Sequence, residues 1–365
     1  MRNSSLACIL ALSMASTSIS AQQQPDKMLL NHMDIGVNLG TTGLGVDLAM
    51  PVGEYVRLRT GFSYMPRIEV PMTFGVQVGQ DAATSKTKFD KLSKALSSFT
   101  GQKVNDEVET TGKPSFANWN VMVDFYPLKN NRHWHVTVGF FLGSSKVAEA
   151  YNKTESMSTL VAMNLFNNLH ERVITSPVLT DKWYFYDNTV EEVLMNIGIL
   201  RDLGFISEKD FPDQLDGVYF NPDNNFVKRG YQNIANYGRM GVYIGKYKED
   251  VVDDEGNVIH HKGDAYMIEP DEQSMVKADM KVNAFKPYLG IGYDGRLLKD
   301  NDRVKIGFDA GVMFWGGTPH LTTHDGTDLI HDVEGVPGKV GDYVSLIRKM
   351  KVCPLLDVRL SFRLF

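Results

Sequence analysis

Histidine and aspartate residues concentrate in one polar segment near the C-terminal end of the sequence. They are His320, His324, Asp325, Asp328, His331 and Asp332. Imidazole and carboxylate groups suit Zn²⁺ or another divalent cation. Their spacing here is loose, which favours a polar loop without a metal. If a metal binds, the candidate ligands are His320, His324 and His331.

Sequence motifs of enzymatic catalysis are absent. The sequence contains no GxSxG, HExxH or phosphate-binding loop, and Cys8 and Cys353 form no paired cysteine motif. We therefore expect no cofactor. An enzyme remains an alternative in which loop residues build the active site.

A second set of ionisable residues occurs at every other position within otherwise apolar stretches. Alternate residues of a β-strand point to opposite faces of a sheet, so these charges would lie on one face and the apolar residues on the other. The set comprises Asp34, Asp47, Arg57, Arg59, Asp124, Asp294, Lys305, Asp309, Asp357 and Arg359, and Arg363 has the same pattern.

Eight stretches of the sequence follow this two-residue period. They are residues 33–40, 44–50, 56–64, 118–125, 134–142, 289–294, 304–314 and 356–364. Each approaches the roughly 9–11 residues that a tilted strand needs to cross the hydrocarbon of a bilayer. Aromatic residues lie near both ends of the strands, as in the two interfacial girdles of a membrane barrel. Among them are Tyr126, Tyr288 and Trp315.

The connections between these strands fall into two classes. Short turns at 51–54, 128–132 and 298–302 alternate with long segments at about 66–115, 146–285 and 317–350, and the segment 40–43 is short as well. Short turns on one side and long loops on the other predict an all-β fold. It is an eight-stranded antiparallel transmembrane β-barrel with periplasmic turns and extracellular loops.

The long connections are predicted to have structure of their own, because ordinary loops are much shorter. Apolar periodicity predicts helices at 86–99, 157–173 and 340–349, and a capping signal predicts another helix that starts near Val190. Residues 241–246 and 265–268 are typical of a hairpin. We expect these elements to form a small α+β cap over the mouth of the barrel.

The N-terminal segment is typical of a cleaved signal peptide spanning residues 1–21, with Arg2 before a short apolar stretch and small residues at 18–20. The barrel with its insertions would then occupy residues 22–365.

The formal net charge is −6 at pH 7 and there is no basic stripe, so nucleic acid is not an expected partner.

Three glycine-rich or terminal stretches carry a resemblance to known proteins. They are FKPYLGIGY at 285–293, KIGFDAGVMF at 305–314 and the terminal RLSFRLF. These stretches resemble outer-membrane barrel proteins of Bacteroidetes, and the architecture is similar to OmpA-type barrels without their peptidoglycan-binding domain. The resemblance implies a location in the outer membrane with loops on the cell surface. It also implies two partners: outer-membrane lipid, and the barrel-assembly machinery through the C-terminal strand.

The bore of an eight-stranded barrel is about filled by its own side chains. We therefore predict that the luminal charges pair with one another and plug the barrel. The predicted function is structural, or surface recognition in which the loop cap binds an extracellular ligand or protein. The alternatives are a membrane-embedded enzyme with a loop-borne site and a narrow channel.

Overall fold

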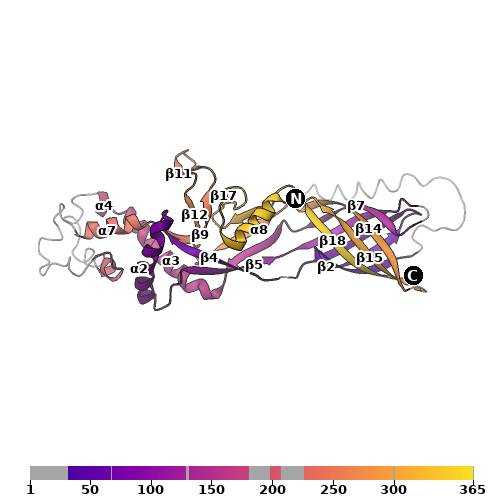
Figure 1. Cartoon of the computed structure of the whole chain (residues 1–365), viewed down its shortest axis with the longest axis horizontal. Coiled ribbons are helices and arrows are strands. Elements are labelled where there is room, and N and C mark those ends of the chain that lie inside the picture. The colour runs from indigo at the N-terminus through magenta and orange to yellow at the C-terminus, as the bar shows by residue number, and fades with distance from the viewer. Residues whose placement is uncertain are drawn as a thin grey trace, which may run out of the picture.

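The computed structural model describes residues 32–66, 68–128, 131–180, 198–206, 226–298 and 301–364. The predicted signal peptide and the helix predicted to start near Val190 lie outside these residues. The described chain forms a closed barrel and an insertion unit that follow one another along the long axis of the molecule (Figure 1). No helix in the described ranges is long and apolar enough to cross a membrane.

The barrel consists of eight antiparallel strands, each hydrogen-bonded to its neighbours in chain order along the barrel wall. They are β1 (Asp34–Gly40), β2 (Gly43–Pro51), β3 (Val56–Tyr64), β6 (Ala117–Phe125), β7 (Trp134–Gly143), β14 (Phe285–Leu298), β15 (Asn301–Met313) and β18 (Cys353–Arg363). β1 pairs along its whole length with the C-terminal part of β18, which closes the barrel. The eight predicted strands and the predicted fold class are confirmed, and β14 is longer than predicted at both ends.

Apolar side chains cover the outside of the barrel. Val37 is 50% exposed, Val138 55% and Leu356 67%. Phe125 and Trp134, near the short turns, also point outward and are about half exposed. Such a surface is unfavourable in water and favourable in hydrocarbon, so the outside of the barrel has the character of a lipid-facing wall.

Three of the aromatic residues assigned to the girdles do not belong to them. Tyr126 points inward, and its hydroxyl donates a hydrogen bond to luminal Asp294 at 2.9 Å. Tyr288 and Trp315 are each only 6% exposed, and the Trp315 indole donates to the carbonyl of Met350. The prediction was wrong for Tyr126 and Tyr288 because it used their place near strand ends, whereas their parity along the strand points them inward.

The insertion unit is built from all three long connections. The first supplies β4 (Val70–Val78), α2 (Ala82–Thr100) and β5 (Glu107–Pro114), and the third supplies β16 (His320–Thr323), β17 (Val333–Glu334) and α8 (Gly338–Lys349). The second supplies β8 (Lys146–Asn152), η1 (Thr154–Ser156), α3 (Met157–Ile174), α4 (Pro177–Thr180), α7 (Phe226–Tyr237), β9 (Met240–Tyr247), β10 (Val251–Val252), β11 (Val258–His260), β12 (Ala265–Ile268) and β13 (Lys277–Lys281).

Apart from β10 and β11, the strands of this unit form one sheet, and the unit has one apolar core. The sheet has the strand order β12-β9-β4-β5-β8-β13-β16, with β17 paired to β9, while β10 and β11 form a separate hairpin. The predicted α+β character and the three predicted helices within the described residues are confirmed. With a sheet and a core of its own, the unit is larger than the small cap that we expected.

Local sequence explains where the two longest helices lie. α2 begins after Asp81, whose carboxylate accepts a hydrogen bond from the first turn, and ends at Gly101, which has φ +68°. Its buried residues Phe89, Leu92 and Leu96 recur every three or four positions and face the core.

α3 is attached to the sheet through a polar contact as well as an apolar face. Leu160, Met163 and Phe166 are fully or almost fully buried. The buried side chain of Asn167 donates to the carbonyl of Met240 at 2.7 Å and accepts from its N–H at 2.8 Å. Asn167 thereby satisfies the backbone at the start of β9.

Candidate functional site

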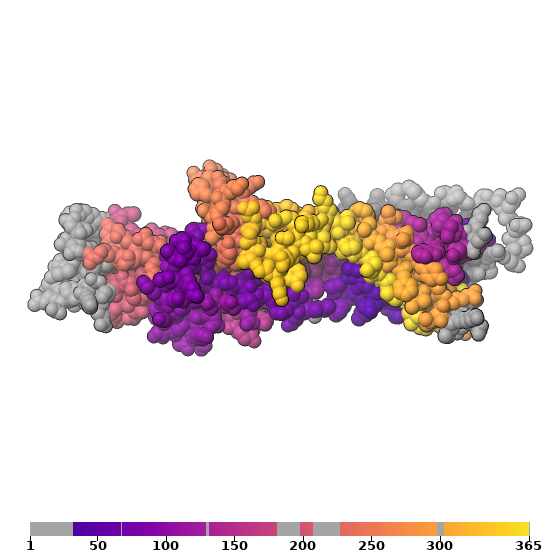
Figure 2. All heavy atoms as spheres, viewed as in Figure 1, coloured from indigo at the N-terminus to yellow at the C-terminus, as the bar shows by residue number. Residues whose placement is uncertain are grey.

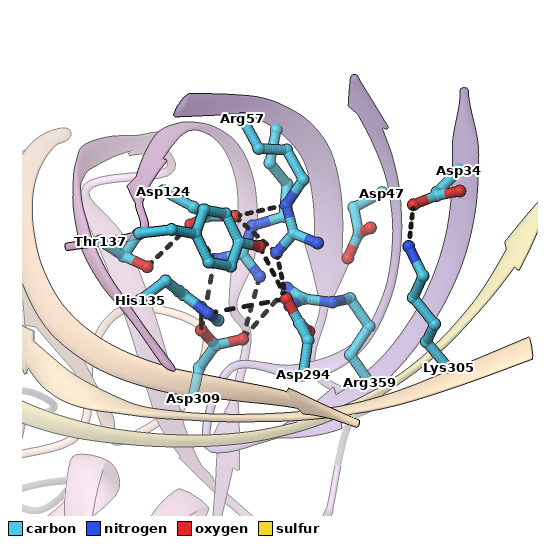
Figure 3. Close-up of polar contacts among 12 residues, drawn as sticks. Asp34, Asp47, Arg57, Asp124, His135, Thr137, Asp294, Lys305, Asp309 and Arg359 are labelled. Atoms are coloured by element: carbon cyan, nitrogen blue, oxygen red, sulfur yellow. Dashed lines mark hydrogen bonds and ion pairs between the residues drawn. The ribbon is translucent and has the colours of Figure 1, made fainter. Parts of the chain in front are cut away.

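Inward-facing charges meet in the middle of the barrel, where three arginines and three aspartates form a closed ring (Figure 3). They come from β3 and β6 on one side of the barrel and from β14, β15 and β18 on the other. We call this set the arginine–aspartate ring; in order around the ring, its members are Arg57, Asp124, Arg59, Asp309, Arg359 and Asp294.

One half of the ring joins β3 to its neighbour β6 and, across the bore, to β15. Arg57 and Asp124 are cross-strand partners, with Nη2 of the arginine 2.8 Å from Oδ2 of the aspartate. The other oxygen of Asp124 lies 3.1 Å from Nη2 of Arg59. Nη1 of Arg59 in turn lies 2.9 Å from Oδ2 of Asp309 on β15.

The other half of the ring returns through β18 and β14. Nη1 of Arg359 lies 3.0 Å from Oδ2 of Asp309, and its Nη2 lies 3.0 Å from Oδ1 of Asp294. Oδ2 of Asp294 lies 2.7 Å from Nη2 of Arg57, which closes the ring. Each guanidinium therefore contacts two carboxylates, and each carboxylate contacts two guanidinium groups.

The ring is buried and electrically balanced. Its side chains are at most 9% exposed, and three positive charges face three negative charges. An unpaired charge in this environment would carry a large desolvation cost, whereas paired and hydrogen-bonded charges offset it. Removing one member would leave each of its two neighbours with one ion-pair partner instead of two.

Three further polar side chains complete the ring. Nε2 of His135, whose side chain is fully buried, lies 3.0 Å from Oδ1 of Asp309. The Thr137 hydroxyl donates to Asp124 at 2.7 Å, and Tyr126 donates to Asp294. The sequence prediction named only charged residues and therefore missed these three side chains, although the alternation along β7 already points His135 and Thr137 inward.

Two glycines provide the space that the ring occupies. A Cβ at Gly307 would lie 2.6 Å from Oδ1 of Asp294 and 3.1 Å from Nη2 of Arg359. A Cβ at Gly292 would collide with His135 and with Asp309. The alternation of glycine and charge along β14 and β15 is therefore a packing requirement: glycine lies where a ring side chain crosses from a neighbouring strand.

Three more of the luminal charges lie toward the short turns. Asp34 is 3.2 Å from Nζ of Lys305, and one of its oxygens is 3.9 Å from Nε of Arg363. Lys305 and Arg363 are partly exposed, with side-chain exposures of 24% and 34%. These contacts are separate from the ring and open to solvent.

The remaining two predicted acids have no cationic partner within 4.0 Å among the described residues. Asp47 accepts a hydrogen bond from the Asn38 amide at 3.1 Å, and its second oxygen has no partner. Asp47 and Asp357 both line a small cavity of about 50 Å³, which lies on the side of the ring toward the insertion unit. The expectation that every luminal acid pairs with a base is thus not met for Asp47 and Asp357.

The ring separates two spaces inside the barrel. A vestibule of about 560 Å³ opens at the short-turn end and is lined by Arg57 and Asp294 among others. The cavity of about 50 Å³ on the other side is lined by Arg59 and Asp309. Opposite faces of the same ring therefore border two spaces of very different size.

The mouth toward the insertion unit is packed with apolar side chains. Phe141, Tyr288 and Leu355 are among the buried residues of this cluster. Lys286 is fully buried beside it, and its Nζ donates to Oδ1 of Asn118 at 3.1 Å and to backbone carbonyls. Lys286 was missed because the predicted strand started after it, yet it has the same parity as Tyr288.

The histidine-rich loop lies in the insertion unit, and the structure brings two of its three candidate metal ligands together. Nδ1 of His320 and Nδ1 of His331 lie 2.6 and 2.8 Å from the same oxygen of Asp328. His324 instead contacts the carbonyl of Glu269 through Nε2. Burial acts to raise the pKa of Asp328, but hydrogen bonds from both histidines and from the backbone outweigh it and lower that pKa below its usual value.

Comparison with known proteins gives no family for this chain. No family model matches the sequence, and no curated protein matches it. Among solved structures, CarO2 of Acinetobacter baumannii is 13% identical, with 92% of this chain and 100% of that chain covered and a TM-score of 0.34. CarO of the same organism is 12% identical (93% and 99% covered, TM-score 0.32), and a major outer membrane protein from Thermus thermophilus is 10% identical (91% and 98% covered, TM-score 0.24).

Proposed function

We propose that this protein is an outer-membrane β-barrel with a plugged lumen, which anchors the insertion unit and displays it at the cell surface. The displayed unit then serves a structural role or recognises an extracellular ligand or protein. The apolar outer wall supports placement in a membrane, because alternate residues such as Val37, Val138 and Leu356 would otherwise face water.

The observation that carries the proposal is the arginine–aspartate ring. A conducting pore needs a continuous column of water, whereas side chains about fill the bore of an eight-stranded barrel. Here six charged side chains contact one another across that bore, and an apolar cluster fills the mouth beyond it. The arrangement favours an anchor over the alternative of a narrow channel.

Conductance in planar lipid bilayers tests this proposal. Purified wild-type protein, shown to be folded by its shifted migration on an unheated gel, is expected to give no steady current. The heat-denatured preparation serves as the control for contaminants. A steady, ion-selective single-channel current from the folded protein would overturn the plugged lumen and favour the channel.

A further inference from the structure

An apolar cavity of about 310 Å³ lies in the insertion unit between one face of the large sheet and α8. In Figure 2 the segment that contains α8 (yellow) covers one side of the insertion unit next to the barrel. The walls are mostly aliphatic. They include Val70, Met72, Met280, Leu321, Val340 and Val344.

A row of small residues across three neighbouring strands creates this space. Gly112 on β5 is paired with Ala150 on β8, and Ala150 is paired with Ala278 on β13. Paired residues of adjacent strands point to the same face of a sheet, so all three line the cavity together. Larger side chains at these positions would have filled the sheet surface under α8.

α8 covers this row without filling the space above it. Its C-terminal part is fixed by Arg348, which donates to the carbonyls of Ile330 and Val333 at 3.0 and 2.9 Å. Val344 lines the cavity and is 3% exposed, whereas Tyr343, which also lines it, is 50% exposed. The cavity is therefore roofed by a helix and remains accessible at one side.

Water is a poor occupant of this cavity, because a buried water needs two or more polar partners and the walls are almost entirely apolar. If the space is empty, the atoms that line it lose the van der Waals contacts that they would otherwise make, which is unfavourable. A volume about twice that of a 150 Å³ apolar cavity that accepts benzene has room for about a dozen carbon atoms. It also falls at the lower end of the roughly 300–1,000 Å³ found for ligand pockets.

We propose that the cavity beneath α8 binds one aliphatic chain of about a dozen carbon atoms, such as a medium-chain acyl group. Met72 and Met280 favour a flexible chain, because thioether side chains adapt their rotamers to irregular apolar partners. The inference depends on the proposed function only for the side of the membrane from which the ligand comes. Binding itself is independent of conductance, so the two proposals fail separately.

Equilibrium dialysis of the full chain in detergent, with radiolabelled dodecanoate as the probe, tests the inference. Delipidated wild-type protein is expected to bind one dodecanoate above the micelle background. The double substitution Ala150→Leu and Ala278→Leu fills the cavity and is expected to weaken binding by about tenfold or more, because the added side chains occupy the ligand's space.

The matched control is Ala82→Leu with Ala83→Leu, which adds the same atoms at exposed positions of α2 and should bind like the wild type. Ala278→Leu alone is a milder variant if the double variant fails to fold, and it is expected to show weaker binding as well. The inference is overturned if the wild type binds no dodecanoate, or if a folded cavity-filled variant binds it as the control does.

Discussion

At the scale of residues, the arginine–aspartate ring behaves as one unit because each member contacts two others. We predict that Arg59→Ala or Asp309→Ala each lowers the free energy of unfolding by about 3–5 kcal/mol, since each leaves two buried charges with one partner instead of two. The double variant should cost less than the sum of the two, because the second change removes a charge that has already lost one of its two partners. Urea unfolding in lipid vesicles measures all three values.

An exposed ion pair of similar length provides the control for this cycle. Nζ of Lys153 lies 2.8 Å from Glu109, with side-chain exposures of 35% and 52%. Its coupling should be only about 0.2–1 kcal/mol. Equal coupling for the two pairs would contradict a buried, desolvated ring.

The sequence indicates which residues face the lumen but not which of them touch. Strand parity placed Asp47 and Asp309 alike on the inner face, yet only Asp309 contacts arginines. The contacts of Arg59 show why: its partner Asp309 is 250 positions away in the sequence, and the two meet only through the curvature of the closed barrel. Parity along one strand carries no information on distances across a bore.

At the scale of elements, the prediction concerns which face of a strand meets lipid. Val138 lies in the middle of β7, points outward and is 55% exposed. We predict that Val138→Arg lowers the free energy of unfolding in vesicles by about 2–4 kcal/mol, because the charge must enter the hydrocarbon near the midplane. Reversible unfolding by guanidinium chloride measures the difference.

The β10–β11 hairpin offers a matched substitution outside the barrel. Val252 is 54% exposed, and Val252→Arg should change the unfolding free energy by no more than about 0.5 kcal/mol, as for ordinary surface positions. If both arginines have the same small effect, the outside of β7 does not face lipid.

Elements differ in how much of their arrangement the sequence reveals. The barrel strands are predictable because each pairs with its neighbours in chain order and alternates without interruption. The sheet of the insertion unit was not predicted, because its strands come from different connections. β4 of the first long connection pairs with β9 of the second, and β13 of the second pairs with β16 of the third. Pairings between segments so far apart leave no local signal in one sequence.

At the scale of the whole molecule, the short turns and the insertion unit lie at opposite ends of the barrel, as seen along the long axis in Figure 1. β1 begins and β18 ends at the short-turn end, where Asp34 is paired with Arg363. In an outer membrane, the proposed orientation therefore places the short turns in the periplasm and the insertion unit outside. The orientation is a prediction that labelling of single cysteines decides.

We predict that a membrane-impermeant maleimide labels Glu255→Cys on intact cells, because Glu255 lies in an exposed turn of the insertion unit. Gly53→Cys, in the short turn between β2 and β3, should be labelled only after the outer membrane is disrupted, and a side chain fits there because nothing lies within 4 Å of its Cβ. The unsubstituted protein is the background control, because Cys353 is buried. Labelling of Gly53→Cys but not of Glu255→Cys on intact cells would show that the barrel has the reverse orientation, and the insertion unit would then face the periplasm.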